Sequence, residues 1–481
     1  MSINEFIQGN DNYGQSIVDL FSEGKEVVVI SDLHLSAGLQ ENNNYDGTEN
    51  FYADDSCARF LQYLVDKQKD KKSILIINGD FIDFLRIRNY PIAESEFTAW
   101  KNILQNIGIH KNEEELKKCI TKKERDFGLR TDDYKSVWKL HKCIYGHKIL
   151  FQQLAYWLKE GNQLYILKGN HDLEWYWAAV RNYLRYLLTE FASPNDTLGY
   201  ANMFMQNLLF FDDSITIDGK IYITHGHVFE NITEVKGSPV VEDGKQLNLP
   251  FGSFLNRYLI NRLELAYPFL DNVRPTQKIL PLLIRERFPL AIKYLFYYIP
   301  FTILIIPKKM YKEVFKYLLD IFIIIILPLL IAGFAIYKNV HLPSTTNSSF
   351  IGTQLINLVK NMAPLMLSYF FARILAMARL SSPPSFFPFA QKICKENDTI
   401  ETVVFGHTHN PEQHKDGDKR YFNTGTWMPV YDLSMADVRL DKTYTYLHIK
   451  PGTSSGIESQ LLLRWNDDAL RPDPMVLRDL R

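Results

Sequence analysis

The sequence predicts an α/β fold that carries a large apolar helical insertion. Three short apolar runs, Glu26–Ile30, Ser73–Ile77 and Gln163–Leu167, each end in a polar cluster, which is typical of buried strands followed by turns. Helical patterns lie between them at Cys57–Asp66 and Leu140–Leu158. This β-α-β alternation is typical of α/β proteins. In their open sheets, ligands bind beyond the carboxyl ends of the strands, where each polar cluster lies.

The length and the composition limit the class of protein. A chain of 481 residues can form one large domain with an insertion, or two or three domains. Its 46% hydrophobic and 23% charged residues are close to the averages for soluble globular proteins, which argues against wholesale disorder and against a polytopic membrane protein. With 54 basic and 55 acidic side chains, the formal net charge is -1. We expect no nucleic-acid partner, because no overall positive field would attract one.

The cysteines and the first residues indicate the compartment. The four cysteines, Cys57, Cys119, Cys143 and Cys394, are widely separated and form no C-x-x-C pair, so a reducing compartment is expected. Residues Met1–Asn10 have neither a basic start nor an apolar run, so no secretion signal is visible. We therefore expect the catalytic part of the chain to lie in the cytoplasm.

Two histidine clusters follow strand candidates that lie far apart in the second half of the chain. Ile221–Thr224 precedes His225-Gly226-His227, and Glu401–Phe405 precedes Gly406-His407-Thr408-His409. A structureless loop of roughly 170 residues is not expected inside a compact domain, so the interval predicts a folded insertion. We place the core at residues 1–230 and 400–481 and the helical, membrane-associating insertion at residues 231–399.

The insertion contains two long apolar runs. Tyr294–Ile306 is the first, and Ile321–Tyr337, which carries no charge, approaches the length of about 20 residues that crosses a bilayer. Met362–Ala378 offers a poorer return pass because of Pro364 and Arg373. The insertion therefore either crosses the membrane as a hairpin or forms a cap of helices that pack together or lie on the membrane surface. Either alternative predicts lipid contact, at the inner face of a membrane.

The polar clusters at the strand ends contain side chains that suit a pair of metal ions. Carboxylate and imidazole groups two residues apart can hold one cation, a further aspartate can bridge two, and an asparagine adds an amide oxygen. This mixed oxygen and nitrogen set favours Mn²⁺ most, with Fe, Zn²⁺ or Co²⁺ as alternatives, over an all-oxygen Ca²⁺ site. Two such ions would clamp a phosphoryl oxygen and generate hydroxide near neutral pH. The candidate ligands are Asp32, His34, Asp80, Asn170, His225, His407 and His409.

Each motif alone is more often an ordinary turn, but five of them in order, each after an apolar run, indicate a common site. The five are Asp32-Leu33-His34, Gly79-Asp80-Phe81-Ile82-Asp83, Gly169-Asn170-His171-Asp172, His225-Gly226-His227 and Gly406-His407-Thr408-His409. With these motifs the chain resembles the calcineurin-like metallophosphoesterases over Lys25–Glu230 and from Glu401 onward. The resemblance implies a two-sheet sandwich flanked by helices.

The resemblance also implies a role for each candidate ligand. Asp32, His34 and His409 would hold the first metal ion. Asp80 would bridge the two ions, and Asn170, His225 and His407 would hold the second.

By the same resemblance, His171 would stand near the substrate as a general acid or as a donor to the phosphate. A histidine suits this role because its pKa lies near working pH. Asp83 or Asp172 would fix its orientation. His227 is expected to support a ligand rather than to bind metal, and His141, His147 and His414 are expected to be ordinary surface or helix residues.

Within the family, Asp-Leu-His-Leu at the first motif and Gly-His-Thr-His-Asn-Pro at the last look like the branch that includes UDP-2,3-diacylglucosamine diphosphatase, a peripheral membrane enzyme. That branch has arginine at the position of His171 and aspartate at that of His227. We expect hydrolysis of phosphoester or pyrophosphate bonds in a phosphorylated small molecule or in a lipid-linked substrate such as UDP-2,3-diacylglucosamine. The alternatives are a catalytically silent membrane-associated scaffold and a nuclease.

Two further segments follow the motifs. Trp175-Tyr176-Trp177 is interpreted as part of the core, with the lining of a substrate pocket as the alternative. Asn423–Trp427 is expected to turn back under the site.

Overall fold

The computed structural model describes the chain in two compact units. The described residues are 17–18, 24–40, 43–68, 71–193, 197–267, 270, 279–321, 333, 385–429, 431–432, 437–438, 442–452 and 456–475. The first unit comprises Met1–Asn272 and Ser385–Arg481, and the second comprises Val273–Pro384.

One sheet of the first unit contains the strands that the apolar runs predict. In the described part of the chain it has seven strands in the order β15-β14-β13-β2-β3-β4-β5. Strands β2 to β5 are parallel, whereas β13, β14 and β15 are antiparallel to their neighbours. The bounds are β2 (Glu26–Ile30), β3 (Ser73–Asn78), β4 (Gln163–Leu167), β5 (Leu208–Phe211), β13 (Thr445–Pro451), β14 (Ile457–Asn466) and β15 (Arg471–Pro474).

The second sheet brings the two distant histidine motifs together. Among the described residues it has six strands in the order β1-β6-β7-β8-β10-β9. Strands β7 and β8 are parallel neighbours, with Ile221 opposite Thr402, so the histidines that follow them leave the same edge. The bounds are β1 (Ile17–Val18), β6 (Ser214–Ile217), β7 (Ile221–Thr224), β8 (Thr402–Phe405), β9 (Glu412–Asp416) and β10 (Lys419–Asn423). A separate two-stranded pair joins β11 (Tyr431–Asp432) and β12 (Asp437–Val438).

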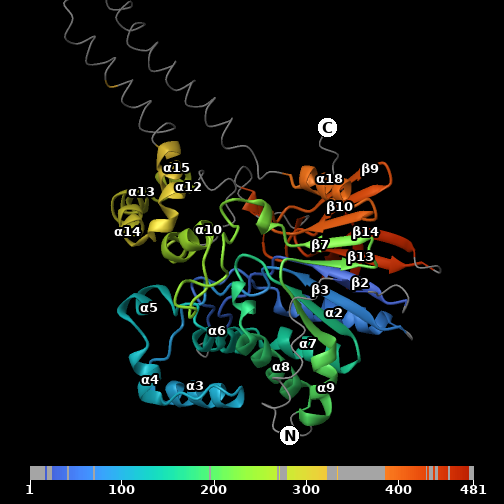
Figure 1. Cartoon of the computed structure of the whole chain (residues 1–481), viewed down its shortest axis with the longest axis horizontal. Coiled ribbons are helices and arrows are strands. Elements are labelled where there is room, and N and C mark those ends of the chain that lie inside the picture. Colours follow the sequence, from blue (N-terminus) through green and yellow to red (C-terminus); the bar gives the residue numbers. More distant parts are fainter. Residues whose placement is uncertain are drawn as a thin grey trace, which may run out of the picture. The chain divides into compact units, whose positions relative to one another are not determined.

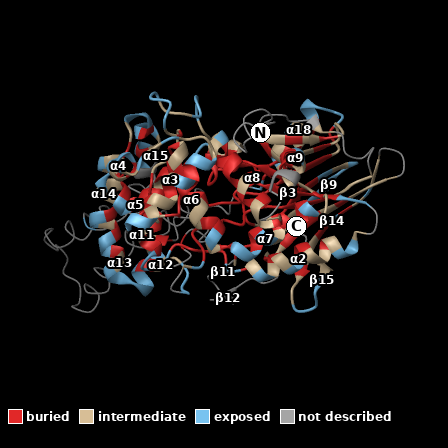
Figure 2. Cartoon of the chain, turned by 90° about the horizontal axis from the view of Figure 1, so that it is seen from below, coloured by how far each residue is buried: buried red, intermediate tan, exposed pale blue. Residues whose placement is uncertain are grey.

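Successive side chains of a strand point to opposite faces of the sheet, so alternate residues of the first sheet pack on its two faces. Val27 and Val29 of β2 pack in one core with Ile221 and Ile223 of the second sheet. The intervening Val28 packs in another core with the helices. The buried residues follow the strands and the inner sides of the helices (Figure 2). The two sheets therefore pack face to face, which confirms an α/β fold with two mixed sheets.

Helices cover both outer faces of this pair of sheets (Figure 1). On the side of the first sheet lie α2 (Asp54–Lys67), α6 (Asp133–Gly146), α7 (Lys148–Lys159), α8 (Ala178–Ala192) and α9 (Thr197–Asn207). On the outer face of the second sheet, α18 (Phe387–Glu396) packs against β8 and β10. Further helices are α3 (Glu94–Asn106), α4 (Glu113–Lys118), α5 (Lys122–Phe127), η2 (Leu173–Tyr176), η3 (His227–Phe229), α10 (Phe251–Leu255), η4 (Asn256–Ile260) and α11 (Asn261–Glu264).

The single helix expected at Leu140–Leu158 is two helices, α6 and α7, which meet at His147. Gly146 lies so close to the Ala37 carbonyl that any side chain there would overlap it. The chain turns at this contact, which no local helical pattern could reveal.

The second unit is helical in the residues that the structure describes. Its helices are α12 (Ile279–Glu286), α13 (Phe288–Lys293), η7 (Tyr294–Tyr298), α14 (Ile299–Ile305), η8 (Lys308–Met310) and α15 (Tyr311–Ile321). By length and composition, the stretch Phe288–Ile305 could cross a membrane, with a mean hydropathy of 1.5. Of the two expected passes, Met362–Ala378 and all but the first residue of Ile321–Tyr337 lie outside the described residues.

The boundaries between the two units differ from the domain boundaries expected from the sequence. Residues 231–272 and 385–399, which were assigned to the insertion, belong to the first unit. Helices α10 and α11 lie in this stretch, and they bond the loops of the first unit through Ser253, which donates to the Asn170 carbonyl, and Asn261, which donates to the Leu85 carbonyl. Composition therefore does not locate this boundary.

A buried ion pair supports the loop after β2. His147 places Nε2 3.1 Å from Glu49 Oε2 and Nδ1 3.0 Å from Asp54 Oδ1. Glu49 in turn accepts backbone N–H bonds from Ser36 and Gly38. Burial lowers the pKa of His147, but Glu49 and Asp54 outweigh it and raise the pKa to about 10.

We predict that His147→Gln lowers the free energy of unfolding by about 3 kcal/mol or more at pH 6, because Glu49 loses its buried partner. The folded pKa of about 10 lies above the unfolded value of about 6.5, so this stabilisation is complete below the unfolded pKa and is lost as the pH rises toward 10. Urea unfolding of both proteins at pH 6 and pH 9 measures it. An equal difference at both pH values would contradict the assignment.

Candidate metal centre

Five loops that leave the carboxyl ends of β2, β3, β4, β7 and β8 bring the predicted ligands together. Three groups of side chains have ligand atoms within 4.8 Å of one another, and each could hold a metal ion. Asp80 belongs to two of these groups, as does His34. The groups are Asp32, His34 and His409; His34, Asp80 and His171; and Asp80, His225 and His407.

Short distances connect the members of these groups. His409 Nε2 lies 3.3 Å from Asp32 Oδ1 and 3.2 Å from His34 Nε2. His34 Nε2 lies 3.4 Å from Asp80 Oδ2, and His225 Nε2 lies 3.1 Å from the same oxygen. Asp80 thus stands between the two sets of histidines, which is where a bridging ligand has to be.

The backbone of the centre is strained at five of the seven candidate ligands. Their φ angles are positive, from 50° to 68°, a region that residues other than glycine seldom adopt. Each such residue costs about 1 to 3 kcal/mol, which the surrounding structure must offset. Backbone strain of this kind concentrates at functional sites. The five are Asp32, His34, Asp80, His407 and His409.

Two glycines allow the loops to approach one another. A Cβ atom at Gly79, where φ is 79°, would overlap the ring of His225. A Cβ atom at Gly169 would overlap the carboxylate of Asp80. Both positions therefore exclude larger residues, because the backbone itself forms the wall of the centre.

Hydrogen bonds from the backbone fix the carboxylates. The N–H of His171 donates to Asp80 Oδ1 at 2.9 Å, and the N–H of His407 donates to Asp32 Oδ2 at 3.0 Å. The loop after β2 also pairs with the loop after β3, since the N–H of His34 donates to the Asp80 carbonyl at 2.9 Å. The motifs therefore hold one another in place.

The charges of the centre attract cations. Burial lowers the pKa of His34, but Asp80, Asp32 and Asp83 raise it to about 10. Burial likewise lowers the pKa of His225, but Asp80 and Asp32 raise it to about 9. Protons on these rings thus balance the buried carboxylates, in the place where metal ions would supply the positive charge.

The donor atoms fit a pair of divalent cations. Among the described side chains, Asn170 Oδ1 is a buried atom without a hydrogen bond, and such an atom is costly unless a ligand satisfies it. His225 Nδ1 lies 2.8 Å from the carbonyl oxygen of Asn78, which leaves Nε2 facing Asp80. Asp32, His34 and His409 could hold one ion, and Asn170, His225 and His407 another, with Asp80 shared between them.

Solvent reaches the centre mainly at three of its side chains. Asp32, Asp80 and His225 are at most 1% exposed, whereas His171, His407 and His409 are each 9% exposed. His171 is therefore among the residues that a substrate would meet.

The structure separates the two carboxylates that were candidates to orient His171. Asp83 Oδ2 lies 2.8 Å from His171 Nδ1, and it also lies 3.3 Å from His34 Nδ1. Burial would raise the pKa of Asp83, but His171, His34 and Arg86 hold it well below its usual range. Arg86 bonds Asp83 and, on its other side, Glu264 of α11.

Asp172 bonds backbone and side-chain groups other than His171. Its oxygens accept hydrogen bonds from the backbone N–H of Gly169 at 2.6 Å, from that of Phe81 at 2.9 Å and from Trp175 Nε1 at 2.9 Å. None of the hydrogen bonds of the described residues joins it to the ring of His171. Burial and the charge of Asp80 raise the pKa of Asp172 to about 7. Asp172 therefore ties the loop after β3 to the loop after β4, and Asp83 alone orients His171.

His227 lies beside the centre, with its ring centre 5.5 Å from that of His225. It belongs to none of the metal-holding groups found among the described residues. Burial and the charge of His225 hold the pKa of His227 well below its usual range, so its ring is neutral. His141 bonds Tyr183 at 2.7 Å, away from the centre.

Several supporting residues were not anticipated from the sequence. Glu230 Oε2 lies 3.1 Å from His407 Nε2. Ser253 of α10 donates to the carbonyl oxygen of Asn170 at 2.9 Å, from a segment that was assigned to the insertion. No motif signals such contacts, because the partners lie far apart in the sequence.

The two segments that follow the motifs behave differently. Thr426 donates to the carbonyl oxygen of Asp32 at 2.7 Å, so the stretch after the last motif does turn back under the centre. Trp175 is fully buried in the core, but the neighbouring Tyr176 lines a cavity. The interpretation as core is thus confirmed for Trp175, and the lining of a substrate pocket stays a prediction.

We predict that binding of Mn²⁺ at pH 7 releases about two protons per chain, because the ligand histidines must be neutral to bind metal. The pKa values of about 10 for His34 and about 9 for His225 mean that both rings start protonated, so affinity should fall as the pH is lowered from 9. Titration calorimetry in buffers of different ionisation enthalpy measures the release, with His414→Gln as the control. Heat that does not depend on the buffer would contradict this prediction.

Two comparisons with known proteins give no match for this chain. A scan against models of protein families gives no match, and a search of curated proteins finds no similar sequence. The description of the centre therefore depends on its own residues.

Proposed function

We propose that this chain is a metal-dependent hydrolase of phosphoester or pyrophosphate bonds, of the calcineurin-like metallophosphoesterase kind. The observation that carries the proposal is the convergence of two metal-holding groups on the shared Asp80. The two-sheet α/β fold and the order of the five motifs support it. When bound, two divalent cations supply the Lewis acidity that polarises phosphoryl oxygens and activates water near neutral pH.

The chain's own residues supply the remaining requirements of such a reaction. His171, held by Asp83 at 2.8 Å, is one of the three more exposed side chains of the centre, where it can give a proton to the leaving oxygen or donate a hydrogen bond to the phosphate. Asp83 occupies Nδ1 of the ring, which leaves Nε2 as the nitrogen that can bond a substrate. The buried walls around Asp80 exclude bulk water, which strengthens each of these interactions.

A second part of the proposal concerns the helices of Val273–Pro384 and a lipid surface. Three large apolar side chains there are strongly exposed: Phe296 at 75%, Leu304 at 83% and Phe315 at 68%. Exposed apolar residues on helices that also carry Lys293 and Lys312 favour contact with a membrane that contains anionic lipids. A membrane-bound enzyme of this kind suits a lipid-linked phosphate substrate at the inner face of a membrane.

Turnover tests the hydrolase proposal. With Mn²⁺, the chain should release phosphate from simple phosphomonoesters, and Asp80→Asn should reduce kcat by about 100-fold or more because the shared ligand is lost. His171→Ala should reduce kcat by about 100-fold on an alkyl phosphate but far less on p-nitrophenyl phosphate, whose leaving group needs no proton. The exposed His414→Gln serves as the matched control.

Each outcome has a separate meaning. Unchanged turnover in Asp80→Asn would remove the two-metal hypothesis. An equal loss on both esters in His171→Ala would remove the general-acid role while leaving the hydrolase in place. Full metal content without turnover of any ester would favour a silent scaffold.

Vesicle binding tests the membrane contact. The chain should co-sediment with vesicles that contain phosphatidylglycerol, and a Phe296→Ser, Leu304→Ser, Phe315→Ser variant should bind at least about 100-fold more weakly, since each buried apolar side chain contributes about 1.5 to 3 kcal/mol. The control is Ile92→Ser, which removes a side chain that is 76% exposed in the first unit. Equal binding of the triple variant would refute the contact.

A further inference from the structure

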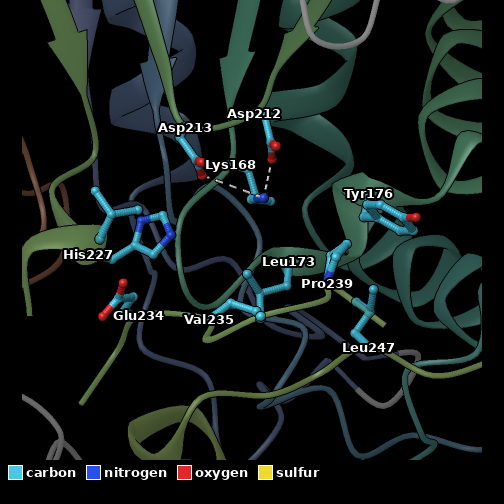
Figure 3. Close-up of a pocket in the computed structure, with 12 residues that line it drawn as sticks. Lys168, Leu173, Tyr176, Asp212, Asp213, His227, Glu234, Val235, Pro239 and Leu247 are labelled. Carbon is cyan, nitrogen blue, oxygen red and sulfur yellow. Dashed lines mark hydrogen bonds and ion pairs between the residues drawn. The ribbon is translucent and has the colours of Figure 1, made fainter. Parts of the chain in front are cut away.

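A cavity of about 330 Å³ lies next to the candidate metal centre (Figure 3). The loops that carry the metal ligands also form its wall. Lys168 stands two residues before Asn170, Leu173 follows His171, and His227 follows His225. The volume is that of a site for a small molecule. The cavity is therefore placed to receive a group attached to whatever the metal centre binds.

The wall of this cavity is anionic. It contains three carboxylates, those of Asp212, Asp213 and Glu234, and one ammonium group, that of Lys168. The sum of three negative charges and one positive charge is -2. Lys168 pairs with Asp212 and lies 3.7 Å from Asp213. A phosphate or a polyanion would be repelled here, whereas an ammonium group would be attracted.

A buried nitrogen in the same wall lacks a partner. His227 is 2% exposed, and its Nδ1 atom makes no hydrogen bond among the residues that the structure describes. Buried polar atoms are nearly always satisfied, so an unsatisfied one that lines a cavity indicates a ligand. In Figure 3, His227 and Glu234 lie on one side of the cavity, and Tyr176 and Leu247 lie on the other. A ligand with a polar group and a short apolar part matches both sides.

From these observations the geometry points to a phosphate ester whose alcohol carries an ammonium group, with the ammonium bound in the cavity between Glu234 and Asp213. This assignment rests on the proposed function and specifies its substrate class. The cavity adjoins the metal centre, because His227 in the cavity wall packs beside His225 of the centre with the ring centres 5.5 Å apart. Tyr176, on the side of the cavity opposite to Glu234, can pack on the carbons that link the ammonium group to the phosphate.

The reaction that this assignment describes is an ordinary hydrolysis. The oxygen of water bonds to phosphorus, and the bond between phosphorus and the alcohol oxygen breaks. The leaving oxygen takes up a proton, so the products are inorganic phosphate and an amino alcohol. No oxidant, reductant or further co-reactant is required.

A comparison of matched esters tests the assignment. In the Mn²⁺-loaded full chain, kcat/KM for O-phosphoethanolamine should exceed that for 2-hydroxyethyl phosphate by about 10-fold, the contribution expected from a charge-assisted hydrogen bond. In a Glu234→Gln, Asp213→Asn variant the ratio should fall to about one. The control Glu458→Gln removes an exposed carboxylate on β14 and should leave the ratio unchanged.

A binding measurement that does not depend on turnover completes the test. Calorimetry should show tighter binding of 2-aminoethylphosphonate than of ethylphosphonate, and the double variant should remove the difference while retaining its metal. Hydrolysis of p-nitrophenyl phosphate without any preference for the amine would overturn the cavity assignment alone. No hydrolysis of any ester would remove the proposed function and this assignment with it.

Discussion

Three carboxylates, those of Asp32, Asp80 and Asp83, are buried together at one edge of the sheets and require positive charge near them. An uncompensated buried charge costs several kcal/mol, so the chain can keep this arrangement only by surrounding it with cations. In the chain alone, the histidines and Arg86 provide them. The pairing of β7 with β8 is what makes this possible, because it delivers two histidine motifs from distant parts of the sequence to one edge.

The need to hold these buried carboxylates in place also explains the hydrogen bonds that surround the centre. Five ligand residues adopt a left-handed backbone at a cost of about 1 to 3 kcal/mol each, and the hydrogen bonds between the motifs offset it. Asp172, Thr426 and Ser253 bind the loops from outside, so the strained backbones remain fixed. A centre of this kind is preorganised, which is what stabilisation of a developing charge requires. The cavity beside it extends the anionic character of the region to a neighbouring site.

Much of this arrangement is encoded locally and could be predicted. The apolar runs before Asp32, Asp80 and Asn170 are strands, and the order of the polar clusters at their ends indicated a shared site. Ligand types are also local information, because an aspartate or histidine at a strand end carries the same chemistry in any fold. The two-sheet architecture was implied by the resemblance of these motifs to a known family.

Other features depend on contacts between distant residues and could not be predicted. The break between α6 and α7 follows from the approach of Gly146 to Ala37, and the role of Asp172 is decided by which N–H groups surround it. Glu264 binds Arg86 across 178 positions. The periodicity of the sequence does not reveal such pairs, because each of these side chains, taken alone, could equally lie on the surface.

The most direct measurement of the central claim is anomalous X-ray scattering from crystals of the chain grown with Mn²⁺. The account predicts two peaks on either side of the Asp80 carboxylate, one contacting His34 and His409 and the other contacting Asn170 and His225. The absence of any peak at these residues, or a cation bound only elsewhere on the chain, would contradict it.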